Sequence, residues 1–170
     1  LDGDGFIRGM TIRKVGGGRW IDFKRMKWTR EKANALRKKA KPGEMLVDVD
    51  DINAKEGKRC LKMSVEKSES ANEIAEIFFD IPNLEARKTY LITFAYRTDG
   101  DSTFRNMAYV NVPGKGWRQI VDASKPAAGE WKRAGVAFTT GKKSGTALLQ
   151  FRTWCEKRGT TGALRVDDVK

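Results

Sequence analysis

Residues 148–154, LLQFRTW, carry side chains that could hold a polar ligand. In an extended strand successive residues point to opposite faces, so Gln150, Arg152 and Trp154 would share one face while the alternate residues join a core. An indole stacks on the C–H side of a sugar ring, a guanidinium pairs with a carboxylate or sulfate, and an amide pairs with hydroxyls. The stretch therefore predicts a surface suited to an acidic sugar.

A second stretch, residues 88–111, could complete that surface. Residues 90–97 and 107–112 show the period-two alternation of strands, and the link TDGDST between them holds an Asp-Gly turn signal. We expect this pair to form the centre of a β-sandwich with Arg97, Tyr109 and Asn111 on the face opposite the core. These side chains would line one groove together with Gln150 and Arg152, and Trp117 in PGKGW is expected at its rim.

Simpler structural roles remain open for each of these side chains. Trp154 and Tyr109 could pack at the edge of the core. The two arginines could instead pair with Glu76 or Asp80 on the sheet surface, where an ion pair contributes about 0–1 kcal/mol and implies no function.

Short strand signals recur along the chain after Pro42-Gly43, separated by turns rich in Gly, Pro, Asn, Asp and Ser. They cover residues 45–49, 60–65, 73–81, 90–97, 107–112, 118–121, 131–139, 147–154 and 163–169. Many short strands without long helices between them favour an antiparallel sheet over a parallel α/β sheet. We therefore predict an all-β fold, an antiparallel β-sandwich of the jelly-roll type.

The N-terminal part differs in composition. Residues 1–19 end in a triple glycine and are expected to be a linker or an N-terminal extension with a possible edge strand, which leaves 20–170 as the sandwich domain. Residues 29–41, TREKANALRKKAK, predict one short basic helix or loop insertion that Thr29 caps and Pro42-Gly43 ends.

The charge balance favours a polyanionic partner. Lys and Arg number 34 against 22 acidic residues, a net charge of +12. Such a field attracts nucleic acid, anionic membranes or acidic polysaccharides, although it can also serve only solubility. No apolar run approaches the roughly 20 residues of a membrane helix, so no membrane partner is expected. The chain opens without a signal peptide, and we expect a fragment of a longer polypeptide.

Catalysis finds little support in the sequence. The chain has no His, the commonest acid and base near neutral pH. Its adjacent acidic residues lie in turns or in the last predicted strand, where neighbours point to opposite faces, so none resembles a glycosidase pair. Cys60 and Cys155 lack the spacing of a zinc site, and they could form one disulfide between strands or remain buried free thiols.

Five pieces occur in order between residue 20 and the end: DFKRMKW, EGKRCLKMSV, KTYLITFAYRT, GEWKRAGVAFTT and ALRVDDVK. In this order the chain resembles the carbohydrate-binding modules of the galactose-binding-like jelly-roll group, around families four, nine, sixteen and twenty-two. The resemblance implies a non-catalytic domain that holds an attached glycoside hydrolase or polysaccharide lyase near its polysaccharide, outside the cell or at its surface. A monomer is expected.

The resemblance also implies a structural calcium ion. Asp167 matches the closing acid of the group, and backbone carbonyls near Glu56 and Gly57 could contribute. Where the group often has Glu after Phe, this chain has Lys24 after Phe23, which removes one carboxylate. Asp167 could instead cap a turn or pair with a neighbouring cation.

Three hypotheses follow. The favoured one is a module that binds an anionic polysaccharide, uronate-rich or sulfated, on the concave face of the sandwich. The second is a basic nucleic-acid-binding domain that uses residues 24–41, and we favour it less than the polysaccharide hypothesis. The third is a structural or adhesion jelly roll without a glycan site.

Overall fold

The regular elements that the structure describes are all β-strands. The computed structural model describes residues 10–15, 20–22, 46–50, 52–56, 60–71, 74–123 and 129–170. Its strands are β1 (Met10–Val15), β2 (Trp20–Asp22), β3 (Leu46–Asp50), β4 (Cys60–Val65), β5 (Ile74–Leu84), β6 (Thr89–Gly100), β7 (Phe104–Val112), β8 (Gly116–Ala123), β9 (Lys132–Thr139), β10 (Gly145–Cys155) and β11 (Gly162–Asp167). The predicted basic helix or loop insertion at 29–41 lies outside the described residues.

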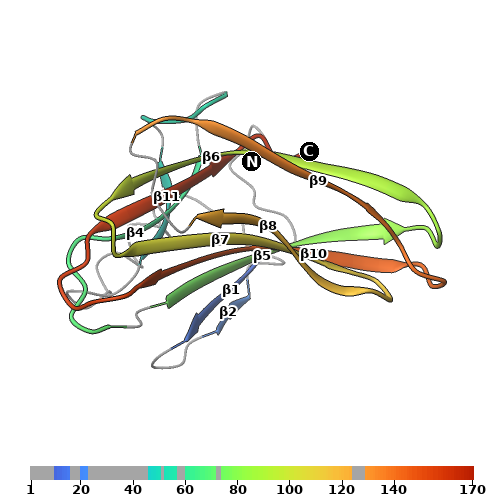
Figure 1. Cartoon of the computed structure of the whole chain (residues 1–170), viewed down its shortest axis with the longest axis horizontal. Helices are drawn as coiled ribbons and strands as arrows, with labels where there is room; N and C mark the ends of the chain where they lie inside the picture. Colours follow the sequence, from blue (N-terminus) through green and yellow to red (C-terminus); the bar gives the residue numbers. More distant parts are fainter. Residues whose placement is uncertain are drawn as a thin grey trace.

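The strands form two antiparallel sheets that pack face to face (Figure 1). One sheet has six strands in the order β2-β1-β5-β10-β7-β8, and the other has five in the order β3-β4-β11-β6-β9. Every pairing is antiparallel. The predicted antiparallel β-sandwich is therefore confirmed.

The strand alternation places the core between the two sheets. In β7 every second residue from Phe104 to Val112 is buried, which is the period-two pattern expected of a strand with one face in a core. Phe94 of β6 and Phe151 of β10 meet edge to face with their ring centroids 4.9 Å apart, so they join the two sheets at the centre. Burial of one such side chain stabilises the fold by about 1.5–3 kcal/mol.

The link between β6 and β7 carries the chain from one sheet to the other. The Asp101 carboxylate organises it: Oδ1 accepts from the Thr103 N–H at 2.9 Å, and Oδ2 accepts from the Thr161 N–H at 2.8 Å. The expectation that β6 and β7 share a surface is therefore wrong. The Asp-Gly signal marks a crossing between layers here, and each strand pairs with others in its own sheet.

Residues 10–15, expected in a linker or extension with a possible edge strand, form β1. This strand lies between β2 and β5, so β2 is the edge of the six-stranded sheet. The division of the chain into 1–19 and 20–170 stays a prediction.

Candidate functional site

The outer face of the six-stranded sheet brings together most of the predicted ligand-binding residues. On β10, Leu149, Phe151 and Thr153 are buried in the sandwich, so Gln150, Arg152 and Trp154 occupy the opposite side of the strand. We call this outer surface, around β10, the β10 face.

β7 lies beside β10 and adds its own alternate residues. Gln150 is opposite Tyr109 and Leu148 is opposite Asn111. Val110, which lies between Tyr109 and Asn111 on β7, is buried in the sandwich. Tyr109 and Asn111 are therefore on the β10 face, as predicted. The Tyr109 hydroxyl contacts the Met107 sulfur on the same strand.

Trp117 is the second residue of β8. It is opposite Asn111 and its side chain is 51% exposed. Its ring meets Phe78 of β5 edge to face, with centroids 6.4 Å apart. Because β10 and β7 lie between β5 and β8, these two rings lean toward each other over the β10 face.

Arg97 does not join this group, and that prediction is wrong. It lies on β6 in the other sheet, where its Nε and Nη2 donate to Asp99 Oδ1 at 3.2 Å each. The cause is the link between β6 and β7, which places the two strands in different layers.

A buried carboxylate lies beside the polar residues of β10. Glu76 of β5 is 6% exposed, and its Oε1 accepts a hydrogen bond of 3.0 Å from Gln150 Nε2. Arg152 Nε is 3.6 Å from the same oxygen and is buried without a hydrogen-bond partner. The ion pair between Arg152 and Glu76 that the sequence left open is therefore present, and it offsets the charge of the guanidinium.

The Arg152 guanidinium also lies over an aromatic ring. Its central carbon is 5.7 Å from the Trp154 ring centroid, within the range of a cation–π contact. The Arg152 side chain remains 39% exposed, so a ligand can reach it. Trp154 is half-buried, and it both supports Arg152 and shows part of its ring to the surface.

Sequence reasoning missed Phe78, and it named Glu76 only as an alternative ion-pair partner for the arginines. The alternation in β5 does contain them, because Ala75 and Ile77 are buried and their neighbours must face outward. What the alternation cannot show is that β5 pairs with β10, where Glu76 is opposite Arg152 and Phe78 opposite Gln150.

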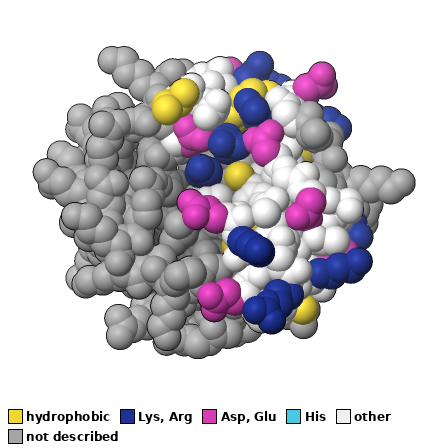
Figure 2. Space-filling view, turned by 90° about the vertical axis from the view of Figure 1, so that its left-hand side faces the viewer, with side chains coloured by type: hydrophobic (Ala, Val, Ile, Leu, Met, Phe, Trp, Pro, Cys, Tyr) yellow, Lys and Arg dark blue, Asp and Glu magenta, His cyan; other side chains and the backbone are white. Residues whose placement is uncertain are grey.

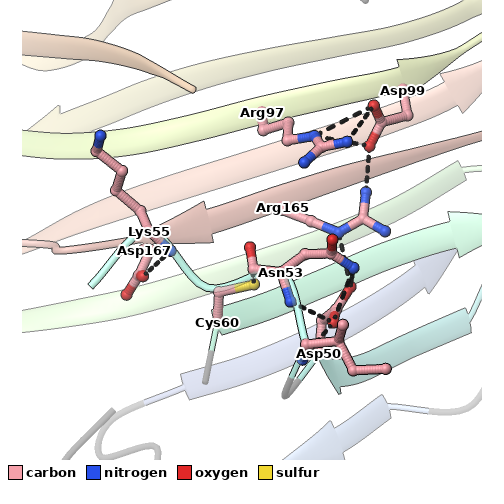
Figure 3. A network of polar contacts seen from close by, with 9 residues as sticks. Asp50, Asn53, Lys55, Cys60, Arg97, Asp99, Arg165 and Asp167 are labelled. Atoms are coloured by element: carbon pink, nitrogen blue, oxygen red, sulfur yellow. Dashed lines mark hydrogen bonds and ion pairs between the residues drawn. The ribbon is translucent and has the colours of Figure 1, made fainter. Parts of the chain in front are cut away.

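The surroundings of Asp167 fit a turn cap better than a calcium ligand. Its Oδ2 accepts the backbone N–H groups of Lys55 and Glu56, each at 2.9 Å, and its Oδ1 accepts that of Asp168 at 2.8 Å. Figure 3 shows Lys55 beside this carboxylate. Within the described residues no three His, Cys, Asp or Glu side chains gather where they could hold a metal. Calcium binding stays a prediction.

Cys60 and Cys155 are buried free thiols on strands of different sheets. Burial raises the pKa of the Cys60 thiol to about 12, and the carboxylates of Asp50 and Asp167 add to this effect. Among the described residues, no helix is long and apolar enough to cross a membrane.

Comparison with known proteins identifies the fold. No protein-family model matches the sequence, and no curated protein matches it. Among solved structures, the chain is similar to carbohydrate-binding modules of the β-sandwich superfamily described for their promiscuous specificity, with a TM-score of 0.58 and 13% identity. A TmCBM61 structure with bound β-1,4-galactotriose gives a TM-score of 0.56 and 16% identity, covering 99% of this chain and 94% of that one.

The fold is the β-sandwich jelly roll of carbohydrate-binding modules. A third similar structure is the enzymatically active domain of tailspike protein 4 from bacteriophage CBA120, with a TM-score of 0.59 and 11% identity. The chain aligns over 99% of its length with the first and third structures, but spans only 58% and 20% of theirs. At this identity the similarity establishes the fold alone.

Proposed function

We propose that this chain is a non-catalytic carbohydrate-binding module that binds a polysaccharide on the β10 face. The observation that carries the proposal is the gathering of aromatic rings and hydrogen-bonding groups on one sheet surface. The exposed Trp117 and the partly buried Phe78 form a ring pair, and the partly buried Tyr109 and Asn111 lie beside it with the buried Gln150. Rings that stack on sugars and side chains that pair with hydroxyls are what such a ligand requires.

The spacing along β10 suits an extended chain. Trp117 aligns across β7 with Leu148, which lies six residues before Trp154 on the strand. At about 3.3 Å per residue the two tryptophan positions are roughly 20 Å apart along the strand direction. Gln150, Arg152 and Glu76 lie between them, so several consecutive sugar units could contact the face at once.

The charges on and around the β10 face are compatible with two classes of polysaccharide, acidic and neutral. The net charge of +12 and the accessible Arg152 support the expected uronate-rich or sulfated polysaccharide. The Glu76 carboxylate beside Arg152 supports a neutral one, because an acidic ligand would meet this anion next to its cation. Calorimetric titration with neutral and acidic polysaccharides distinguishes the classes.

Replacement of Trp117 tests the location of the site. We expect Trp117→Ala to weaken binding of the best polysaccharide at least tenfold, about 1.4 kcal/mol, because a stacking ring is lost. Leu91→Ala is the matched control, since Leu91 is a 66% exposed apolar side chain on the other sheet. Unchanged affinity in Trp117→Ala would show that the ligand binds elsewhere or that the chain binds none.

The wider role is part of the same proposal. We infer that the domain targets an attached glycoside hydrolase or polysaccharide lyase to its substrate outside the cell, and that it acts as a monomer. A calcium ion near Asp167 would show as a fall in melting temperature when EDTA is added. An unchanged melting temperature would argue that Asp167 only caps the turn at Lys55 and Glu56.

A further inference from the structure

The outer face of the five-stranded sheet contains a polar hollow, separate from the β10 face. Its volume is about 590 Å³. It is lined by residues of β4, β6 and β11 and their ends: Lys62, Ser64, Val65, Glu66, Asp99, Gly100, Thr161, Gly162, Ala163 and Arg165. The β10 face belongs to the other sheet, so the two surfaces lie on opposite sides of the sandwich.

Small residues form the floor of the hollow. Ser64 is opposite Ala163, which in turn is opposite Asp99, so short side chains occupy the centre of adjacent strands. Gly100 and Gly162 are paired beyond them, and their chains pass closely: a Cβ on Gly100 would lie 2.5 Å from the Gly162 Cα. A side chain is excluded at Gly100 by this backbone contact, and at Gly162 because a Cβ there would lie 2.3 Å from the Phe104 ring.

A network of ion pairs, which includes the lining residues Arg165 and Asp99, forms one wall of the hollow. Arg165 is 9% exposed, and its Nε donates to Asp50 Oδ2 at 2.7 Å while its Nη1 donates to Asp99. Arg97 holds Asp99 from the opposite direction. Figure 3 shows these four side chains following one another across the sheet. Because each charge faces a partner of opposite sign, this wall is close to neutral.

Two lining side chains are unpaired in the part of the chain that the structure describes. Lys62 lies opposite Arg165 at the edge of the hollow, and Glu66 follows the end of β4. Neither makes a hydrogen bond or ion pair with another described residue. The hydroxyls of Ser64 and Thr161 add groups that both donate and accept.

We propose that this hollow is a second carbohydrate site, which takes a short neutral sugar. Lys62 and Arg165 are balanced by Glu66 and Asp99 in its lining, so an anion gains little there. A ligand with several hydroxyls can accept from Lys62 and donate to Glu66 at the same time. The volume is within the usual range of ligand pockets, about 300–1,000 Å³. The choice of a sugar rests on the proposed function, while the site itself does not.

Amide chemical shifts in a ¹⁵N-labelled sample test the proposal. The probes are glucose, galactose, xylose and mannose, with sulfate and acetate as anionic probes. At least one sugar is expected to shift the amides of 62–66, 99–100 and 161–163, and to do so equally in Trp117→Ala. Ser64→Phe, which fills the hollow, is expected to weaken this effect at least tenfold.

Glu66→Gln is the second variant, because an exposed side chain at the end of a strand can change without loss of folding. It is expected to weaken the same response severalfold at an unchanged melting temperature. The proposal fails if no sugar shifts these amides, or if sulfate or acetate shifts them more strongly than any sugar. Polysaccharide binding that depends on Trp117 would survive either result, so the two proposals can fail separately.

Discussion

Asp50 shows how single contacts set the pH dependence of this fold. Burial alone would raise the pKa of its carboxyl group. Hydrogen bonds from Arg165, from the Ile52 and Asn53 N–H groups and from the Asn53 side chain outweigh burial and hold the pKa well below its usual range. A carboxylate with a lowered folded-state pKa stabilises the fold fully above its unfolded pKa of about 3.9, and this stabilisation is lost progressively as the pH falls from that value through the lower folded-state pKa.

We therefore predict that Asp50→Asn destabilises the protein at pH 7 and somewhat less at about pH 3, because the wild-type carboxylate begins to lose its advantage below the unfolded pKa and loses all of it only below the lowered folded-state pKa. Denaturant unfolding at both pH values measures the difference. An equal loss of stability at both pH values would contradict the role given to the ionised form.

Arg165→Met is expected to destabilise the protein more than Asp50→Asn does at pH 7, by about 3–5 kcal/mol, because it leaves a buried carboxylate without its cation.

Cys60 is predicted to be chemically inert in the folded protein. Its thiol is fully buried, its Sγ is 3.7 Å from the Asn53 carbonyl oxygen, and its raised pKa keeps it protonated at pH 8. Iodoacetamide labelling followed by mass spectrometry should modify Cys60 only after denaturant is added. Rapid labelling of the native protein would mean that the 52–56 segment opens readily.

At the scale of the elements, Gly100 at the end of β6 is predicted to tolerate no side chain. Its φ is +133°, and a Cβ would lie 2.5 Å from both the Gly162 Cα and the Thr161 carbonyl oxygen. We expect Gly100→Ala to destabilise the fold by more than about 2 kcal/mol, since it combines strain with a backbone clash.

Gly116 at the start of β8 provides the matched control. Its φ is +83°, but no atom lies within 4 Å of the position of a Cβ. Gly116→Ala should therefore cost only the conformational strain, about 1–2 kcal/mol. Equal losses in the two variants, measured by denaturant unfolding, would show that the close approach of Gly100 to Gly162 is unimportant.

The positions of the strands could be read from the sequence, because alternation is a local property. Residues 60–65 coincide with β4, and the other predicted strands of the sandwich from residue 45 onward overlap the observed ones with ends shifted by a few residues. The same alternation placed Gln150, Arg152 and Trp154 on one face. Such local signals remain valid whatever the strand pairs with.

Strand partners could not be read, because they depend on contacts between distant residues. Tyr109 and Arg97 are near each other in sequence, yet they lie in different sheets because the link Asp101–Thr103 changes layer. Glu76 and Gln150 are far apart in sequence, yet they share a hydrogen bond. The composition of a turn does not show whether it closes a hairpin or crosses the sandwich.

For the whole molecule, the net charge should affect polyanion binding and glycan binding differently. On the side of the molecule in Figure 2, the described basic and acidic side chains are interspersed. The most basic stretch of the sequence, residues 24–41, lies outside the described residues. The net charge alone attracts nucleic acid without regard to sequence, and the dependence on salt distinguishes this attraction from binding at a defined site.

We predict that retention on DNA or heparin falls steeply between about 50 and 200 mM salt, whereas affinity for a neutral polysaccharide changes little. Calorimetry and a gel-shift assay at the two concentrations provide the comparison. Sequence-independent DNA binding that persists at the higher salt, together with no polysaccharide binding, would favour the nucleic-acid hypothesis.

The position of β11 has a consequence for how the protein is made. This last described strand lies between β4 and β6 in the centre of its sheet. Each of these two strands therefore has one edge that cannot pair until residues 162–167 have been synthesised. A nascent chain that has not yet reached them exposes the unpaired edges of β4 and β6, and such edges attract other chains. Completion of the sandwich must therefore follow, not accompany, the emergence of β11 from the ribosome.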